Sequence, residues 1–257
     1  MQETYLKFRM QLVRIGANDM NVRKIINRLF KKAWFVFAFT VFFNSGFAVE
    51  TEERIVASFD IIRATGRVKV FLKPGKSERL RIEARGVGIS KVFTELNGTT
   101  LKIYTQKGFV DDDIDVKVYV TYKVLREVHS SALADIQTES AIKGDKLVVD
   151  VNSKGQANIN VNVNTLELMV SVSGDLTISG KTKTQNTNVN SDGMLKAFDL
   201  KCERTYIKIN TAGIAEVRAG ELLDATVHTG GNLRYKGNPS KETIKSTLGG
   251  KVTRLAD

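Results

Sequence analysis

The chain has 257 residues, a formal net charge of +11, one cysteine and only two prolines. A single cysteine excludes an intramolecular disulfide, and so few prolines leave almost every backbone amide able to pair in a sheet. Residues 1–48 hold eight Lys/Arg and two Asp/Glu, so residues 49–257 carry 31 basic against 26 acidic side chains. Such a mixed surface lacks the concentrated basic patch typical of nucleic-acid binders, and we expect no nucleic-acid partner.

The N-terminus predicts an export signal. Residues 21–32 carry five Lys/Arg and no acid, residues 33–43 are almost entirely apolar, and small residues stand at Gly46 and Ala48. This order is typical of a secretory signal peptide that is cleaved after Ala48. A retained membrane anchor is the weaker alternative, because eleven apolar residues are short for a bilayer.

The first 19 residues do not fit a signal peptide, so we expect Met20 to be the true start. Residues 1–48 are then an upstream extension plus the signal, and residues 49–257 form one domain without a membrane anchor. This domain is expected to be exported, either to the periplasm or to the cell surface.

Residues 55–124 alternate apolar and polar side chains in short runs, which predicts β-strands. Two turn pairs, Pro74-Gly75 and Asn97-Gly98, separate some of these runs, and Asn-Gly favours a tight hairpin. The expected strands are residues 55–62, 67–72, 79–84, 100–105 and 114–122. We expect this part to be antiparallel and to pack on the first coil of the region that follows, where it would cover the open strand edges.

The rest of the chain repeats one phrase with a period of about 19 residues. The phrase is an apolar residue, a short polar stretch, a glycine and two spaced apolar residues. The anchors are Ala132, Gly155, Gly174, Gly193, Gly213, Gly231 and Gly250. A short, constant period rich in Val, Ile, Thr and Asn indicates stacked β coils, each of which needs its neighbours to bury its apolar side. We therefore predict an all-β fold, a right-handed parallel β-helix-like solenoid.

Each coil repeats the same order of side chains around its anchor. The positions four before, two after and four after the anchor are apolar, and their equal parity places them on one inner side. The position two before is mainly Ser or Thr, which can satisfy backbone groups at a corner. The anchor glycines are expected to be structural, because glycine accepts a positive φ and lets neighbouring coils approach closely.

The corner phrases resemble worn copies of a Ser-Gly-Ser-Gly-x-Val repeat. They are residues 171–176, 210–215 and 228–233. That repeat marks the putative auto-transporter adhesin head GIN domain family, a family of unknown function common in exported Bacteroidetes proteins. Residues 231–239 are similar to the family's closing phrase, and residues 59–62 with 66–70 to its opening. The resemblance covers roughly residues 55–255 and implies a β-helical fold.

Both histidines, His129 and His228, stand three residues before an anchor, on the outward side, five coils apart. At about 4.8 Å per coil they would lie about 24 Å apart, too far to share a metal ion or a proton. Asn, Ser or Thr occupies the same position in other coils. We therefore expect both to belong to an exposed polar ladder, and we expect no catalytic residues, no metal and no cofactor.

The remaining chemically active side chains also have simpler interpretations. Asp175 and Asp192 flank corners of adjacent coils, but no third acid joins them, which favours turn chemistry over a catalytic pair. Asp111–Asp115 lacks the Gly and the distal Glu of an EF-hand, so a solvated loop is favoured while a calcium site stays open. Residues 158–164 alternate Asn with Ile or Val, as in an amide ladder that could also stack on a sugar. Cys202 is expected to be a buried small hydrophobe, the alternative being a reactive thiol.

Two functions from different classes remain. We favour an exported, non-catalytic structural or binding module of adhesin type, whose unknown partner is an envelope protein or polysaccharide. The alternative is a carbohydrate-active enzyme of the β-helix type that acts on an acidic polysaccharide. The lack of a cluster of acids in the repeat favours the first.

Overall fold

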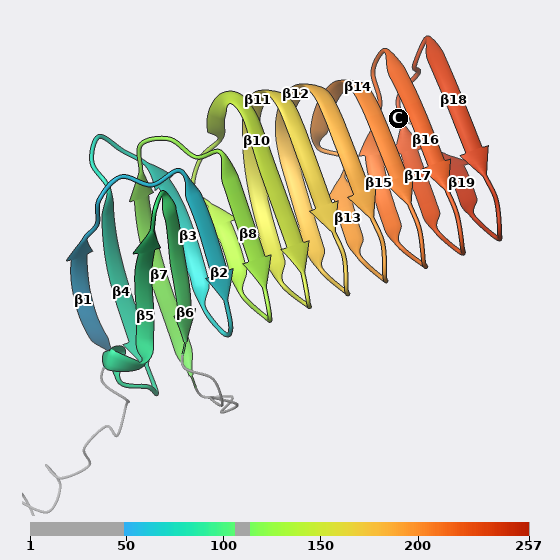
Figure 1. Ribbon diagram of the computed structural model, residues 1–257. Helices are drawn as coiled ribbons and strands as arrows, with labels where there is room; N and C mark the ends of the chain where they lie inside the picture. Colours follow the sequence, from blue (N-terminus) through green and yellow to red (C-terminus); the bar gives the residue numbers. More distant parts are fainter. Residues whose placement is uncertain (1–48, 106–113, 257) are drawn as a thin grey trace, which may run out of the picture. The chain divides into compact units, whose positions relative to one another are not determined.

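The computed structural model describes residues 49–105 and 114–256, which form strands almost throughout (Figure 1). The predicted signal peptide lies outside the described residues, as do Asp111, Asp112 and Asp113. The elements of the first part are β1 (Glu50–Ile55), β2 (Ile61–Thr65), β3 (Lys69–Pro74), β4 (Arg79–Arg85), the 3-10 turn η1 (Ile89–Lys91), β5 (Val92–Asn97), β6 (Thr100–Thr105) and β7 (Asp115–Tyr122).

The repeat region supplies the remaining strands. They are β8 (Glu127–Ser131), β9 (Asp135–Thr138), β10 (Ile142–Asn152), β11 (Gln156–Val170), β12 (Asp175–Val189), β13 (Met194–Ala197), β14 (Leu200–Ile209), β15 (Ile214–Arg218), β16 (Leu222–Val227), β17 (Asn232–Lys236), β18 (Lys241–Ser246) and β19 (Lys251–Arg254). Several of these strands, such as β11 and β12, are long enough to run through a corner and take part in both walls of the coil.

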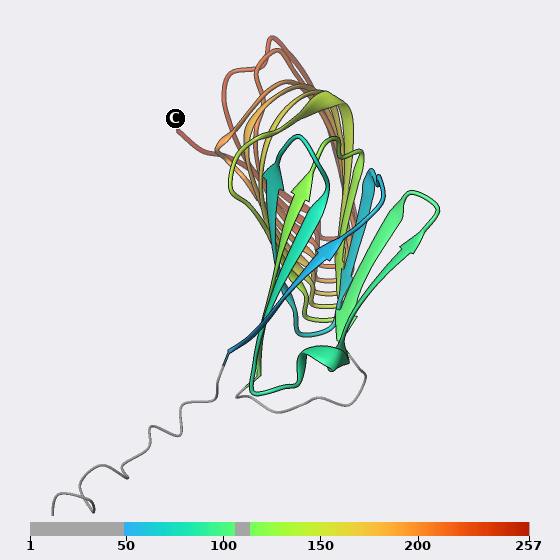
Figure 2. The ribbon, with the colours of Figure 1, turned by 90° about the vertical axis from the view of Figure 1, so that its left-hand side faces the viewer.

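Parallel strands stack into two walls that enclose one interior. The first wall runs β6–β2–β8–β10, continues through the C-terminal parts of β11 and β12, and ends in β14–β16–β18. The second wall runs β7–β3–β9, continues through the N-terminal parts of β11 and β12, and ends in β13–β15–β17–β19. Figure 2 looks along this stack and shows the coils nested one behind another. The predicted solenoid of parallel coils is confirmed.

The strand register shows the repeat directly. Paired residues of successive coils, from β10 to β18, are offset by 19, 19, 20, 18 and 19 positions, so the predicted period is confirmed. The residues of one inner column are Val151, Val170, Val189, Ile209, Val227 and Ser246. Its five aliphatic members are fully buried. Each such side chain removed from water contributes about 1.5–3 kcal/mol, which makes coil-on-coil stacking the main source of stability.

The N-terminal part differs from the prediction in an instructive way. β2 and β3 pair in parallel with β8 and β9 on one side and with β6 and β7 on the other, so all of these strands belong to solenoid coils. Only β1, β4 and β5 pair antiparallel. The predicted antiparallel arrangement is therefore right for the end of the stack and wrong for the coils beneath it. Alternation of apolar and polar residues marks a strand with one buried face but carries no information about the direction of its partner.

The outermost coil is closed by an arginine. Arg54 on β1 donates from Nη1 to the Val92 carbonyl at 3.1 Å and to Thr94 Oγ1 at 2.8 Å, so its side chain connects the second wall to β5 beside the first. Its other nitrogens pair with Glu52 at 2.9 Å. These contacts cover an end of the core that would otherwise present unpaired strand edges to solvent.

Candidate functional site

The tight corners between the two walls are built differently from the prediction. The two residues before each anchor glycine have left-handed backbones, as at Thr211 (φ 50°) and Ala212 (φ 58°), whereas Gly213 itself does not. The expectation of a positive φ at the anchor glycine is therefore wrong. Two consecutive left-handed residues are the conformation of a type I′ turn, whose twist matches the flanking strands.

The anchor glycines meet the backbone of the previous coil. A Cβ on Gly155 would lie 2.4 Å from the Ser130 carbonyl oxygen, and a Cβ on Gly174 would lie 2.3 Å from that of Val151. At Gly213 the nearest atom, the Val189 oxygen, would be 2.9 Å away. Close approach of coils is thus the reason for glycine at these corners. The same tight fit to backbone atoms holds at Gly193 and Gly250, while at Gly231 the nearest atom is the Ile209 side chain at 2.8 Å.

The first corner lies two residues later than predicted. Ala132 and Leu133 carry the left-handed φ values of 50° and 73°, so Ala134, and not Ala132, takes the glycine position. The coil is 21 residues long there, and a fixed count from the apolar columns slips by two. Ser130 consequently points inward, and its hydroxyl donates to the carbonyls of Ala134 and Gln156, each at 2.9 Å.

The two histidines occupy different columns. His129 pairs in register with Asp150, and its side chain, 12% exposed, lies between two carboxylates: Nε2 is 2.9 Å from Glu127 and Nδ1 is 3.4 Å from Asp150. The hydrogen bond from His129 is the main reason that the pKa of Asp150 is lowered. His228 lies two positions further along its strand and contacts Thr247 Oγ1 through Nδ1. The prediction of an exposed polar ladder is therefore wrong for His129.

The acidic residues lie apart from one another. Asp175 forms an ion pair with Lys196 on the next coil at 2.9 Å, whereas Asp192 is an exposed turn residue with φ 59°. Asp115 pairs with Lys69 at 3.4 Å and with Lys117 at 3.1 Å. Among the described residues, no group of three or more His, Cys, Asp and Glu side chains is arranged to hold a metal ion.

Cys202 is buried, as predicted. Its thiol donates to the Arg204 carbonyl oxygen at 3.2 Å, and burial raises the pKa of the thiol. A thiol held in its protonated form is a poor nucleophile, so this position serves packing.

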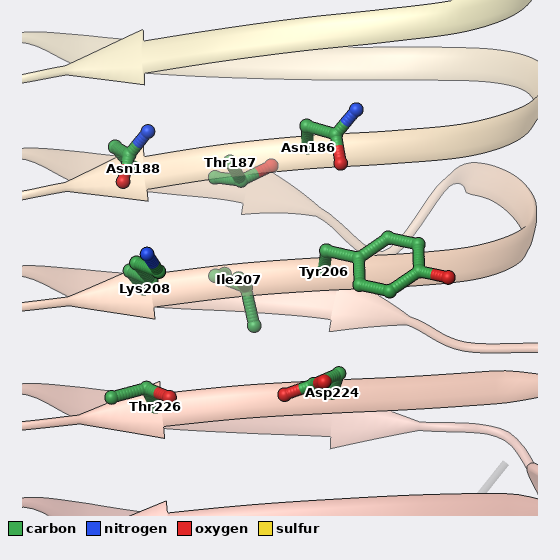
Figure 3. A pocket seen from close by; sticks show the side chains of 8 residues that line it. All are labelled: Asn186, Thr187, Asn188, Tyr206, Ile207, Lys208, Asp224 and Thr226. Carbon is green, nitrogen blue, oxygen red and sulfur yellow. The ribbon is translucent and has the colours of Figure 1, made fainter.

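A groove of about 270 Å³ crosses three strands of the first wall, β12, β14 and β16. We call it the wall groove (Figure 3). The strand register places its outward side chains in two columns. The columns are Asn186, Tyr206 and Asp224, and Asn188, Lys208 and Thr226.

The wall groove offers a ligand an aromatic ring and free polar groups. Tyr206 is 38% exposed, and its ring lies along the wall with the hydroxyl directed away from Lys208 (Figure 3). Within the part of the chain that the structure describes, the outward side chains of the groove form no hydrogen bond or ion pair with one another. Amide, hydroxyl, ammonium and carboxylate groups that lack protein partners are available for hydrogen bonds to a ligand, and the ring adds apolar contact.

Sequence reasoning did not find the wall groove. Counting the period outward from Asn186 would have brought Tyr206 and Asp224 into one column. Nothing in that count shows that the surface is hollowed there, because the hollow depends on how far each neighbouring side chain projects.

The comparisons follow from this geometry. The model of the family described as "Putative auto-transporter adhesin, head GIN domain" matches residues 58–239, more than half of the chain. The chain belongs to this family. No curated protein matches the sequence.

Solved structures share the head GIN fold. A putative adhesin from Bacteroides fragilis is 18% identical, with a TM-score of 0.71 over 81% of this chain and 97% of that one. A putative adhesin from Parabacteroides distasonis is 24% identical, with a TM-score of 0.60 over 82% and 98% of the two chains. A putative lipid binding protein from the same species is 21% identical, with a TM-score of 0.62 over 82% and 98%. At these identities the likeness establishes the fold alone.

A search for membrane-spanning segments gave one result. Among the described residues, no helix has the length and apolar character needed to cross a bilayer.

Proposed function

We propose that this head GIN protein is an exported, non-catalytic binding module whose solenoid surface contacts a polysaccharide of the cell envelope. The wall groove carries the proposal. It combines an exposed ring, Tyr206, with unpaired polar side chains on three neighbouring coils. Sugars present both apolar C–H faces and dense hydroxyl groups, so an aromatic ring beside amides and a carboxylate suits them. The family description as an adhesin supports a binding function.

Replacing Tyr206 by alanine tests the wall groove. The ring is on the outside of β14 and 38% exposed, so its loss should leave the fold intact while weakening binding to purified envelope polysaccharide by about tenfold. The measurement is retention on immobilised polysaccharide, with the thermal midpoint as the check on folding.

Thr243→Ala is the matched control, because Thr243 continues the same column one coil beyond Asp224 and does not line the groove. This variant should bind as the wild type does. Equal binding by Tyr206→Ala and wild type would contradict the proposal, as would retention by envelope lipid vesicles and not by polysaccharide.

Export is part of the same proposal. The basic, apolar and small-residue order of residues 21–48 supports cleavage after Ala48. Protein recovered from the envelope should therefore begin at Val49 when its N-terminus is sequenced. Recovery of protein that still contains residues 33–43 would show that this segment is retained.

A further inference from the structure

A second groove, of about 470 Å³, lies at the opposite corner of the coils, where the second wall turns back into the first. We call it the corner groove. The side chains that matter for its chemistry are Asn162, Asn164, Lys181, Lys183, Lys201 and Glu203. It shares no lining residue with the wall groove.

The corner groove forms where the coil length changes. The register between β12 and β14 is offset by 20 residues, and the next, between β14 and β16, by only 18. The shorter coil has two residues fewer with which to round the corner. Gly220 therefore lies directly against the coil before it: its amide donates to the Cys202 carbonyl at 2.9 Å, and a Cβ there would be 2.8 Å from that oxygen.

The strand register aligns three lysines with this groove. Lys143 is paired with Asn162, Asn162 with Lys181, and Lys181 with Lys201. Neighbouring strands are about 4.8 Å apart, so Lys181 and Lys201 follow one another on successive coils and Lys143 lies two coils before Lys181. Like charges stacked in one column repel each other and lower the stability of the sheet.

Other lysines of the solenoid are neutralised by the next coil. Lys146 pairs with Glu167 at 2.8 Å, and Lys196 pairs with Asp175 at 2.9 Å. Lys143, Lys181 and Lys201 are exposed and form no ion pair within the described coils. The column thus concentrates positive charge along a groove without a protein group that balances it, which is the arrangement that attracts an anion.

The acids of the groove lie along its other side. Glu203 follows Lys201 by two residues, and Glu221 lies on the next coil beside it. An anion is therefore directed onto the lysine column, along the solenoid axis, and is kept away from Glu203. A single small anion would engage only the Lys181–Lys201 pair, whereas a linear polymer with regularly spaced charges reaches Lys143 as well.

We propose that the corner groove binds a linear polysaccharide that carries carboxylate groups, laid across the coils. Its carboxylates would face Lys143, Lys181 and Lys201, and its hydroxyls would bond to the amide of Asn162. The rise of one coil is similar to the length of one sugar unit, so each coil can meet one unit of the chain. This site lies on a different surface from the wall groove and does not depend on it.

The double variant Lys181→Ala/Lys201→Ala tests the site, with an oligogalacturonate as the probe and isothermal titration calorimetry as the measurement. Removing both cations should weaken binding by about tenfold or more, and the wild-type affinity should fall as salt is added. Glu203→Gln should bind more tightly than wild type, because it removes a carboxylate from the groove.

Lys208→Ala/Lys245→Ala is the matched control, since it removes the same charge from the first wall outside the corner groove. This control should bind as the wild type does. An equal loss in both double variants would show unspecific attraction and overturn the proposal. Binding of a neutral maltooligosaccharide or of inorganic phosphate as tightly as the oligogalacturonate would overturn it too. Failure of the Tyr206 test leaves this outcome unaffected.

Discussion

Replacing Gly174 by alanine is expected to destabilise the protein by about 3 kcal/mol. The added Cβ would lie 2.3 Å from the Val151 oxygen and 2.8 Å from its carbonyl carbon, so backbone and not a flexible side chain would have to move. Moving the Val151 carbonyl disturbs the pairing of two coils. Urea unfolding followed by circular dichroism measures the change. Gly213→Ala, where the nearest oxygen is 2.9 Å from the added atom, should cost less.

Gly144→Ala is the control for this prediction. No atom lies within 4 Å of a Cβ at Gly144, and its φ is not left-handed, so the free energy of unfolding should change by less than about 1 kcal/mol. If Gly174→Ala and Gly144→Ala had the same stability, close approach of coils would not be the reason for glycine at the corners.

Leu195→Ala is expected to cost about 3 kcal/mol. Leu195 is fully buried in the middle of the stack, between Leu176 of the coil before and Ala215 of the coil after. The paired backbones on both sides prevent the coils from closing around the lost side chain. Because each coil is stabilised mainly by its neighbours, the variant should also unfold less cooperatively, with a smaller dependence of the free energy on urea.

Val252→Ala provides the comparison, since Val252 occupies the same column in the last coil and is only partly buried. Its replacement should cost less than about 1 kcal/mol and leave the cooperativity unchanged. Equal costs for the two variants would mean that the interior of the stack is no better packed than its end.

Much of the architecture could be predicted because the repeat writes the register into the sequence. Every coil between Val151 and Val227 begins its corner with the same buried column, so counting residues is enough to align neighbouring strands. The first corner could not be placed in this way. Its coil is longer and has Ala134 in the glycine position, so neither the period nor the residue type marks it.

Local conformation was harder to predict than register. Glycine at Gly174 was expected to provide a positive φ, but Val172 and Ser173 adopt φ values of 49° and 57° instead. The turn stays paired from coil to coil, as when the Ser173 amide donates to the Ser191 carbonyl at 3.0 Å. This ladder stabilises a conformation that side chains rarely adopt by themselves.

The grooves lay furthest from prediction. The residues of the wall groove could be aligned by counting, but the corner groove depends on a coil of 20 residues being followed by one of 18. His129 was placed on an exposed ladder because a two-residue slip assigned it to the wrong column, and its contacts with Glu127 and Asp150 were missed. Surface sites therefore depend on small departures from the repeat.

The central claim is that this solenoid binds a polysaccharide without cleaving it. Incubating the purified protein with acidic polysaccharide of the envelope, and following both the bound fraction and the polymer length by size-exclusion chromatography, tests it most directly. We predict that the protein elutes together with the polymer and that the length of the polymer stays unchanged. Shortening of the polymer by the wild-type protein would contradict the account and favour a carbohydrate-active enzyme.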